Sequence, residues 1–401
     1  MGRQHQPADV RSGRGGQSSV SATPWRPVSP FTLMYPFKIL FGRGIVEQLG
    51  QETRRLGSNA FVVCGRAAMK KQGILGRVLE ILKASGVGAE VFDEVESDPS
   101  LATVDRGAQR LKDSSANVVV GLGGGSALDA AKALAAVATQ PESVYTYFDG
   151  APIQSAGLPF VAVPTTAGTG AEVTINAVLT DQRQRTKRSL RNPLMMAAVA
   201  LVDPELTRGM PPYLTACTGM DALVQAIEAF VTKTSNPVSD ALSLRAIELI
   251  VGALPRAVQN GEDMGAREQM ALGSLLSGMA FSNAGLGAVH GLAHPIGAKF
   301  GVPHGHACAV LLPPVIRFNM SVRSDRYAQI ARLIGLQSAE DLVGCLEDLL
   351  AETGLSADFK QWGISEADVP AIVADSRSSS MKKNPREARD EDLRALLAKL
   401  T

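Results

Sequence analysis

The stretch Asn283–His306 reads NAGLGAVHGLAHPIGAKFGVPHGH and contains four of the chain's five histidines. These are His290, His294, His304 and His306. The first two are four residues apart, so a helix would place both imidazoles on one face. The break at Gly301–Pro303 lets the chain turn back and aim His304 at the same point. If the stretch held a single histidine, the better interpretation would be a helical hairpin whose small residues allow close packing, with no metal. Four histidines within seventeen positions, in a chain with only one other, predict a metal site, because imidazole is a common metal ligand.

From Asp203 onward, the sequence has a helical pattern. The long amphipathic segments Thr218–Thr232 and Asp240–Gly252 have no strand-like partners, and the same texture continues to Thr401. We therefore expect residues 203–401 to form an all-helical, metal-binding domain.

Residues 31–202 have a different pattern, in which short β-branched runs alternate with helical segments. The strand-like runs are AFVVC at Ala60–Cys64, VVVGL at Val118–Leu122 and LPFVAVP at Leu158–Pro164. We expect the last of these to close the series, followed by a basic, polar connector between Asp181 and Asp203. The alternation predicts an α/β domain with a Rossmann-like parallel sheet.

Composition restricts the possible classes of protein. A chain of 401 residues is long enough for two domains. Its net charge of +1 gives no sign of a nucleic-acid or membrane surface, and no apolar run approaches membrane-spanning length. Residues 1–30 are rich in Gly, Ser, Arg, Gln and Pro and are predicted to be a disordered extension. The four cysteines are scattered and form no CxxC motif, which favours a reducing cytoplasm.

A glycine-rich loop lies between a predicted strand and a predicted helix. Gly124, Gly125 and Ser126 belong to GGGSALDAAK, in which backbone N–H groups at the start of a helix can bind a pyrophosphate. This is not the GxGxxG motif, and a tight turn without a ligand is the alternative.

A second polar loop, Pro164–Thr174, reads PTTAGTGAEVT. Its hydroxyl groups could bind phosphate, ribose or a carboxamide. Alone, it could equally join two strands, but with the glycine loop it predicts the second wall of a nucleotide cleft.

The segment Asp221–Glu228 (DALVQAIE) offers a carboxylate for a divalent metal. Asp221 and Gln225 are four residues apart and share a helical face. A buried aspartate is costly unless it is paired or binds a metal. The alternative is a solvated acid in the first turn of a helix, near Thr218 and Gly219.

In this order and spacing, these motifs, with the late Asn384–Arg386, resemble the iron-containing (group III) alcohol dehydrogenase family. The resemblance covers Phe31 to the C-terminus. It implies an N-terminal dinucleotide-binding α/β domain and an all-helical C-terminal domain, the architecture shared with dehydroquinate synthases. NAD(P) and one divalent metal, Fe or Zn, would meet between them and interconvert an alcohol with its aldehyde or ketone by hydride transfer.

Matched residue by residue, the resemblance assigns roles in the site. Its metal ligands fall on Asp221, Gln225, His290 and His304. His294 corresponds to a proton relay, although from the residues alone it would serve equally well as a ligand. With an ordinary imidazole pKa of about 6.5, His294 would suit the role of a proton relay. Phe281 corresponds to a wall of the substrate pocket. The cofactor positions are Gly65, Arg66, Asp98, Gly124, Gly125, Ser126, Asp129, Thr165, Thr166, Thr169, Thr174, Asn176 and Lys187.

Two positions depart from the family's pattern. Gln225 stands where the second ligand is usually histidine, and an amide oxygen is a harder and weaker donor than imidazole. Related glycerol dehydrogenases hold zinc without that histidine, and the retained Asp221 argues against a metal-free enzyme like the maleylacetate reductases. Gly65 and Arg66 follow the strand ending at Cys64, where NAD-preferring members carry an aspartate. This favours NADP slightly, unless Arg66 is only a solvated charge.

Other functions on this scaffold are a lyase or synthase resembling dehydroquinate synthase, and a non-catalytic metal or nucleotide sensor. The sequence does not give the substrate. The basic segment Ser376–Arg386, with Arg377, Lys382 and Lys383, hints at an anionic aldehyde, but a solvated loop explains it better. We expect a cytoplasmic homodimer that acts on a small alcohol or aldehyde and binds neither nucleic acid nor membrane.

Overall fold

The structure, a computed structural model, describes residues 1–2, 28–184 and 186–401. By its internal contacts the chain forms two units, Met1–Pro30 and Phe31–Thr401. The predicted disordered extension, residues 1–30, lies mostly outside the described residues. The account below concerns the second unit.

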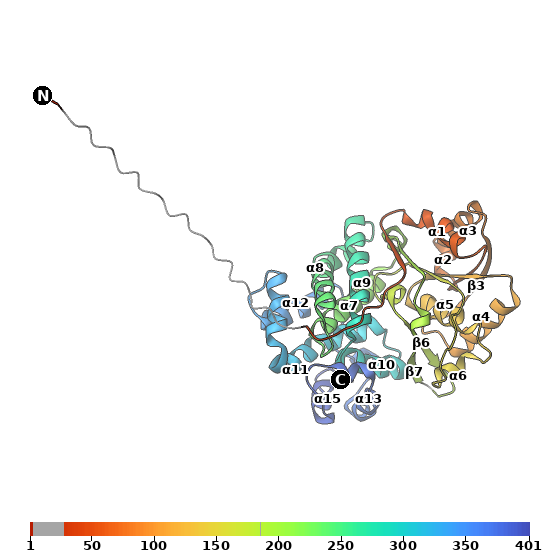
Figure 1. Ribbon diagram of the computed structural model, residues 1–401. Coiled ribbons are helices and arrows are strands. Elements are labelled where there is room, and N and C mark those ends of the chain that lie inside the picture. Colours follow the sequence, from red (N-terminus) through yellow and green to blue (C-terminus); the bar gives the residue numbers. More distant parts are fainter. Residues whose placement is uncertain (3–27, 185) are drawn as a thin grey trace. The chain divides into compact units, whose positions relative to one another are not determined.

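A six-stranded parallel sheet forms one part of this unit (Figure 1). The strand order is β1 (Lys38–Phe41), β8 (Val199–Val202), β5 (Phe160–Pro164), β4 (Val118–Gly123), β2 (Asn59–Gly65) and β3 (Gly88–Val95). The three predicted runs are β2, β4 and β5, so the prediction of a parallel sheet is confirmed. β4 and β5 are buried along their whole length, as expected for strands covered on both faces.

Two expectations for the sheet part were wrong. The sheet does not close with Leu158–Pro164, because β8 lies between β1 and β5. Its four residues, VALV, are too few to give a periodic signal. The polar connector after Asp181 also has structure, since β6 (Asn176–Asp181) and β7 (Thr186–Arg191) pair as an antiparallel ribbon. Most of β7 is exposed or half-buried, which explains its polar sequence.

Helices cover both faces of the sheet, and alternate residues of β2 point to opposite sides. Phe61 and Val63 pack with α4 (Leu101–Asp113) and α5 (Gly125–Val137). Val62 and Cys64 pack on the other side. The helices on that side include α1 (Leu49–Leu56) and α3 (Ile74–Ala84), while α2 (Ala68–Lys71) and α6 (Val144–Phe148) are short.

After β8 the described chain contains helices only, in agreement with the predicted helical part. The long helices are α7 (Pro212–Val231), α8 (Pro237–Gln259), α9 (Met264–Ala284), α10 (Ala288–Phe300), α11 (His304–Leu333) and α12 (Ala339–Glu352). Shorter ones are α13 (Val369–Asp375), α14 (Ser379–Lys383) and α15 (Asp390–Leu397). Short 3₁₀ helices occur at Ile45–Gln48, Ala171–Val173, Pro193–Met195, Pro204–Thr207, Lys360–Trp362 and Glu366–Asp368. The fold class, a parallel-sheet part followed by a helical part, is therefore as predicted.

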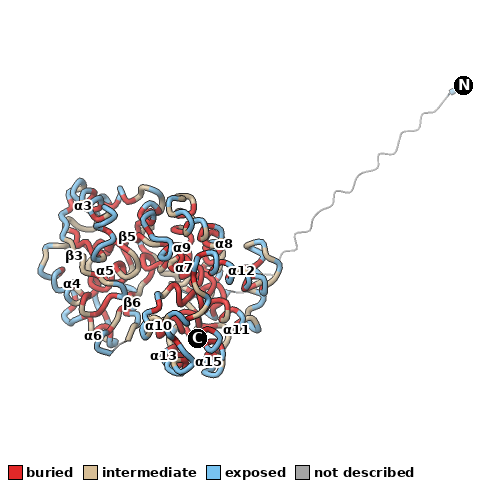
Figure 2. Tube along the Cα trace, turned by 180° about the vertical axis from the view of Figure 1, so that it is seen from behind, coloured by how far each residue is buried: buried red, intermediate tan, exposed pale blue. Residues whose placement is uncertain are grey.

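The helix α7 is the centre of the helical part (Figure 2). It packs against α8, α9 and α11, and nearly all of its residues after Leu214 are buried. It has the length and hydropathy of a membrane span, but 89% of its most apolar window is buried inside the protein. The bent pair α9–α10 passes the same test only if the two helices are counted together across a bend of 104°.

Candidate functional site

Two helices bring the histidines of the central stretch together. His290 and His294 lie on α10, which ends at Gly301, a glycine with a φ of 69°. That left-handed conformation suits glycine and ends the helix. The chain turns there, and His304 begins α11. The His304 ring lies 5.4 Å from the ring of His290 and 5.3 Å from that of His294, measured between centroids.

Asp221 of α7 faces these rings. Its Oδ1 atom lies 3.4 Å from His290 Nε2 and 3.8 Å from His304 Nε2. Asp221 Oδ1 and His290 Nε2 are both buried without a hydrogen-bond partner. A buried polar atom without a partner costs about 1–3 kcal/mol. A divalent cation would satisfy both atoms at once, so these residues fit such a cation.

Glu228 holds His290 in place. This buried carboxylate lies two turns beyond Asp221 on α7, where it accepts hydrogen bonds from His290 Nδ1 at 2.7 Å and from the Val289 N–H at 2.7 Å. A proton on Nδ1 would leave the Nε2 lone pair free for a metal on the side of the ring that faces Asp221. The sequence analysis missed Glu228, although its spacing of seven residues from Asp221 placed it on the same helical face.

Gln225 lies beside Asp221, as the spacing of four residues predicted. Its side chain is buried, and its Oε1 atom accepts a hydrogen bond of 3.5 Å from the Ser277 hydroxyl. A hydrogen bond with Gln225 is also one of the interactions that lower the pKa of Asp221. Whether Gln225 binds the metal stays a prediction.

Cys308 also belongs to this cluster, and the sequence analysis missed it. It is buried on α11, four residues after His304, and its Sγ atom lies 3.7 Å from His304 Nε2. One potential ligand atom from each of Asp221, His290, His304 and Cys308 falls within 4.8 Å of all the others. The signal that could have found Cys308 was its spacing of four residues from His304, which places both side chains on one helical face.

Burial and mutual charge set the protonation of this cluster. Burial alone would raise the pKa of Asp221, but the two imidazoles and Gln225 lower it overall. For His290, burial is outweighed by Cys308, Asp221 and Glu228, so its pKa is raised well above the usual value. Burial lowers the pKa of His304 to about 4 and raises that of Cys308 to about 11.

The expectation of an ordinary pKa for His294 was wrong. Burial, followed by the charges of His304 and His290, lowers the pKa of His294 well below its usual value. The lowered pKa favours the neutral form of the imidazole and makes it a weaker proton acceptor than a free histidine.

The fourth histidine of the stretch points away from this cluster. His306 is buried, and its Nδ1 and Nε2 atoms each lie 3.0 Å from a hydroxyl, those of Tyr213 and Ser356. Its ring packs edge-on against Trp362, with the centroids 4.6 Å apart. With both nitrogens engaged, His306 has a structural role.

The two predicted cofactor loops meet at the start of α5. Gly124 precedes this helix, and no side chain caps its first N–H groups. A Cβ atom on Gly125 would lie 2.6 Å from the Thr169 methyl group, and one on Gly124 would lie 3.1 Å from the Thr166 methyl group. Glycine therefore allows the threonine loop to approach the helix start, where the uncapped N–H groups can receive an anion.

Lys132 joins these two loops, although the sequence analysis gave it no role. Its buried ammonium donates hydrogen bonds to the carbonyl of Ala171 at 2.7 Å, the hydroxyl of Thr174 at 2.9 Å and the carbonyl of Asn176 at 2.8 Å. Burial lowers its pKa to about 8. Thr174 and Asn176 are thus fixed by α5.

Other predicted cofactor residues lie beside the first turns of α5. Asp98 accepts a 2.7 Å hydrogen bond from Lys187 Nζ and has a φ of 54°, which is uncommon outside glycine. The Ser126 hydroxyl accepts from the Asp98 N–H at 3.3 Å. Thr165 donates its N–H to Gly123, and Asp129 accepts from the Val178 N–H.

Burial raises the pKa of Asp129 to about 6. At the end of β2, the nearest atom to a Cβ built on Gly65 would be the Val95 carbonyl oxygen, at 3.6 Å, so the position has room. Arg66 donates to the Glu94 carbonyl.

Phe281 and the late basic segment border the threonine loop and α10. A Cβ atom on Gly170 would lie 3.3 Å from the Phe281 ring, which places this ring against the loop. Arg377 is paired with Asp390. The half-buried Lys383 side chain lies over Gly285, where a Cβ atom would lie 2.4 Å from Lys383 Cδ. Asn384 accepts from the Ala288 N–H at the start of α10, which gives the late Asn-Pro-Arg motif a structural role.

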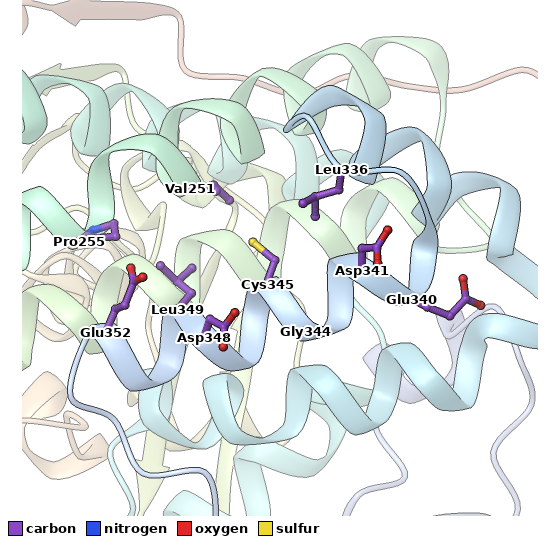
Figure 3. Close-up of a pocket in the computed structure, with 10 residues that line it drawn as sticks. All are labelled: Val251, Pro255, Leu336, Glu340, Asp341, Gly344, Cys345, Asp348, Leu349 and Glu352. Carbon is purple, nitrogen blue, oxygen red and sulfur yellow. The ribbon is translucent and has the colours of Figure 1, made fainter.

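A surface hollow between α8 and α12 shares no residue with this site (Figure 3). Cys345 lies within it, among the acidic side chains Glu340, Asp341, Asp348 and Glu352. It holds no histidine. The cluster of potential metal ligands on α7, α10 and α11 is therefore the candidate site.

Two family descriptions match the chain one after the other. "Iron-containing alcohol dehydrogenase" matches residues 36–204, and "Fe-containing alcohol dehydrogenase family, C-terminal" matches residues 215–401.

Individual relatives cover most of the chain. The lactaldehyde reductase of Escherichia coli (strain K12) is 37% identical over 364 residues, covering 88% of this chain and 95% of the relative. The NADPH-dependent butanol dehydrogenase of Clostridium saccharobutylicum is 40% identical over 347 residues, covering 84% and 88%. A crystal structure of 1,3-propanediol oxidoreductase superposes with a TM-score of 0.90 at 34% identity, covering 93% of this chain and 100% of the other.

Proposed function

The chain belongs to the iron-containing alcohol dehydrogenase family, and from that premise we propose which of its residues carry the activity. The enzyme is a metal-dependent, NAD(P)-linked oxidoreductase that interconverts an alcohol and its aldehyde or ketone. These relatives do not favour a lyase or synthase on the same scaffold. We propose that Asp221, His290 and His304 hold the divalent metal, with Gln225 as the fourth, weaker ligand.

One observation carries this assignment. Asp221 Oδ1 and His290 Nε2 are buried without hydrogen-bond partners and lie 3.4 Å apart, with His304 Nε2 3.8 Å from Asp221 Oδ1. A bound divalent cation supplies Lewis acidity there, and NAD(P) supplies the hydride-transferring carbon. Fe or Zn suits imidazole and carboxylate ligands. Glu228 keeps the His290 ring oriented for this role.

His294 is the proposed proton relay. Its ring lies next to that of His304, and its lowered pKa favours the neutral form, so that a proton taken from the reacting alcohol would pass on to solvent rather than stay on the ring. In the reductive direction, His294 would take up a proton from solvent and pass it to the product. Phe281 is proposed to form a wall of the substrate pocket beside the threonine loop.

The cofactor is proposed to lie along the edge formed by the glycine and threonine loops. The uncapped start of α5 would bind the pyrophosphate, and Lys132 keeps the second loop against it. We propose residues 31–202 as the dinucleotide-binding domain and residues 203–401 as the metal-binding domain. The two family matches, with their boundary between residues 204 and 215, support this division.

Cofactor preference is expected to favour NADP, because Gly65 leaves room for a 2′-phosphate beside Arg66. Gly65→Asp should shift the ratio of kcat/KM for NADP over NAD towards NAD by about tenfold or more, since a carboxylate repels the phosphate. Steady-state kinetics with both cofactors measure this ratio, with Gly76→Asp on the open surface of α3 as the control. A wild-type enzyme that already prefers NAD tenfold would contradict this interpretation of Gly65.

The role of Gln225 is tested by changing its donor strength. Gln225→His should raise the affinity for Zn or Fe, because imidazole is the better ligand for late first-row metals. Gln225→Ala should lose less activity than Asp221→Ala, because the charged ligand stays. Metal titration of these variants decides the role, and unchanged affinity in both Gln225 variants would mean that the amide does not touch the metal.

The overall activity is tested by screening short aldehydes and oxoacids with NADH and NADPH. Oxidation of the cofactor, with one alcohol formed for each cofactor consumed, is the expected result. Metal or nucleotide binding without turnover of any of them would favour a sensor. A dimeric assembly and a cytoplasmic location stay predictions.

A further inference from the structure

The sulfur of Cys308 lies among the proposed metal ligands. Cys308 is one helical turn after His304, so both side chains leave α11 on the same face. Gly305 brings the start of α11 against α7, since a Cβ atom there would lie 2.0 Å from the Cys217 carbonyl oxygen. Cys217 is one turn before Asp221. This close contact helps to bring His304 Nε2 to 3.8 Å from Asp221 Oδ1 and the Cys308 sulfur to within 4.8 Å of the Asp221 carboxylate.

Three of the separations between these atoms are close to those between ligand atoms around one metal ion. Zinc lies about 2.0–2.2 Å from nitrogen and oxygen ligands and about 2.3 Å from sulfur, so its ligand atoms are about 3.3–3.6 Å apart. The observed separations are 3.4 Å for His290 Nε2 to Asp221 Oδ1 and 3.8 Å for His304 Nε2 to Asp221 Oδ1. His304 Nε2 to Cys308 Sγ is 3.7 Å. The remaining separations among the four ligand atoms are no greater than 4.8 Å.

We propose that Cys308 binds the divalent metal through its sulfur, so that the protein supplies an aspartate, two histidines and a cysteine in addition to the weaker amide of Gln225. This inference rests on the metal site proposed above and adds a ligand to it. When the metal binds, the thiol loses its proton to solvent and a metal–sulfur bond forms, with no change of oxidation state. The carboxylate and the thiolate together balance the two positive charges in a buried site.

A sulfur ligand changes which metals the site prefers. Thiolate favours Zn and other late first-row ions, whereas an all-oxygen and nitrogen set tolerates Mn or Mg better. Cys308 therefore offsets the weakening expected from Gln225. Cys308 and Gln225 lie at the same proposed metal site but on different helices, α11 and α7. Their effects on metal affinity can therefore be separated by mutating each residue alone.

Cobalt substitution tests the proposal without measuring turnover. Co²⁺ takes the place of Zn²⁺ in such sites, and a thiolate ligand gives it an intense near-ultraviolet charge-transfer band. We expect this band in the wild-type protein with one Co²⁺ bound, and its loss in Cys308→Ala. Cys217→Ala removes another buried thiol from the adjoining helix and should keep the band, which makes it the matched control.

Zinc affinity gives a second measurement. Competition with a chromophoric chelator should show an affinity lower by about tenfold or more in Cys308→Ala, with little change in Cys217→Ala. If wild-type protein binds one Co²⁺ without the band, Cys308 is not a ligand, while the site of Asp221, His290 and His304 stands. If no Co²⁺ binds and Asp221→Ala behaves like the wild type, the whole metal site is refuted. The wild-type spectrum decides the question even if Cys308→Ala fails to fold.

Discussion

Asp221→Ala is expected to lower kcat/KM for aldehyde reduction by on the order of a thousandfold, because removing the charged ligand removes most of the Lewis acidity at the site. Metal content should fall with activity. The fold should survive, since the carboxylate is a buried group with an unpaired oxygen that costs stability when no cation is bound. Steady-state kinetics and elemental analysis of the purified variant measure both effects.

Asp348→Ala is the matched control for this change. It removes an aspartate from the exposed surface of another helix, α12, and should leave activity and metal content unchanged. An Asp221→Ala enzyme with normal metal content and at least a tenth of the wild-type rate would refute Asp221 as a ligand.

Lys132→Met is expected to lower the free energy of unfolding by about 3–5 kcal/mol, because two buried oxygens and one part-buried oxygen lose a charged donor. The threonine loop would also be released from α5, so KM for NAD(P)H should rise more than KM for the aldehyde. Denaturant unfolding and cofactor titration measure these two effects.

Lys112→Met serves as the control for Lys132. Lys112 makes one hydrogen bond, to the Gln140 carbonyl, and its side chain is exposed on α4. Its replacement should change stability by less than about 1 kcal/mol and leave KM for the cofactor unchanged. Equal effects of the two substitutions would mean that Lys132 does not hold the loop.

Local sequence patterns, such as helical periodicity, predicted much of the fold and identified several of the site residues. His290 and Asp221 lie in helices whose periodicity is strong, and Gly125 lies between a strand and a helix with clear signals on both sides. In each case the residues that define the feature are neighbours in the chain, so a short window contains the information. The turn at Gly301 was predictable for the same reason.

The features that could not be predicted from the sequence depend on contacts between segments that are distant in the chain. Glu228 meets His290 only because α7 and α10 pack together, and Lys132 meets Asn176 only after the sheet has formed. The pKa of His294 is lowered by burial that its own segment does not reveal. Cys308 is different, since its spacing from His304 was visible, but a cysteine gains this meaning only beside Asp221.

The central claim, that a divalent metal in this site is required for alcohol–aldehyde interconversion, is tested most directly by removing and restoring the metal. Wild-type protein is dialysed against a chelator, its metal content is measured, and the rate of NAD(P)H oxidation with an accepted aldehyde is recorded before and after adding Zn²⁺ or Fe²⁺. We predict that the rate falls in proportion to the metal lost and returns when about one ion per chain is restored. Undiminished turnover by protein shown to contain no metal would contradict the account.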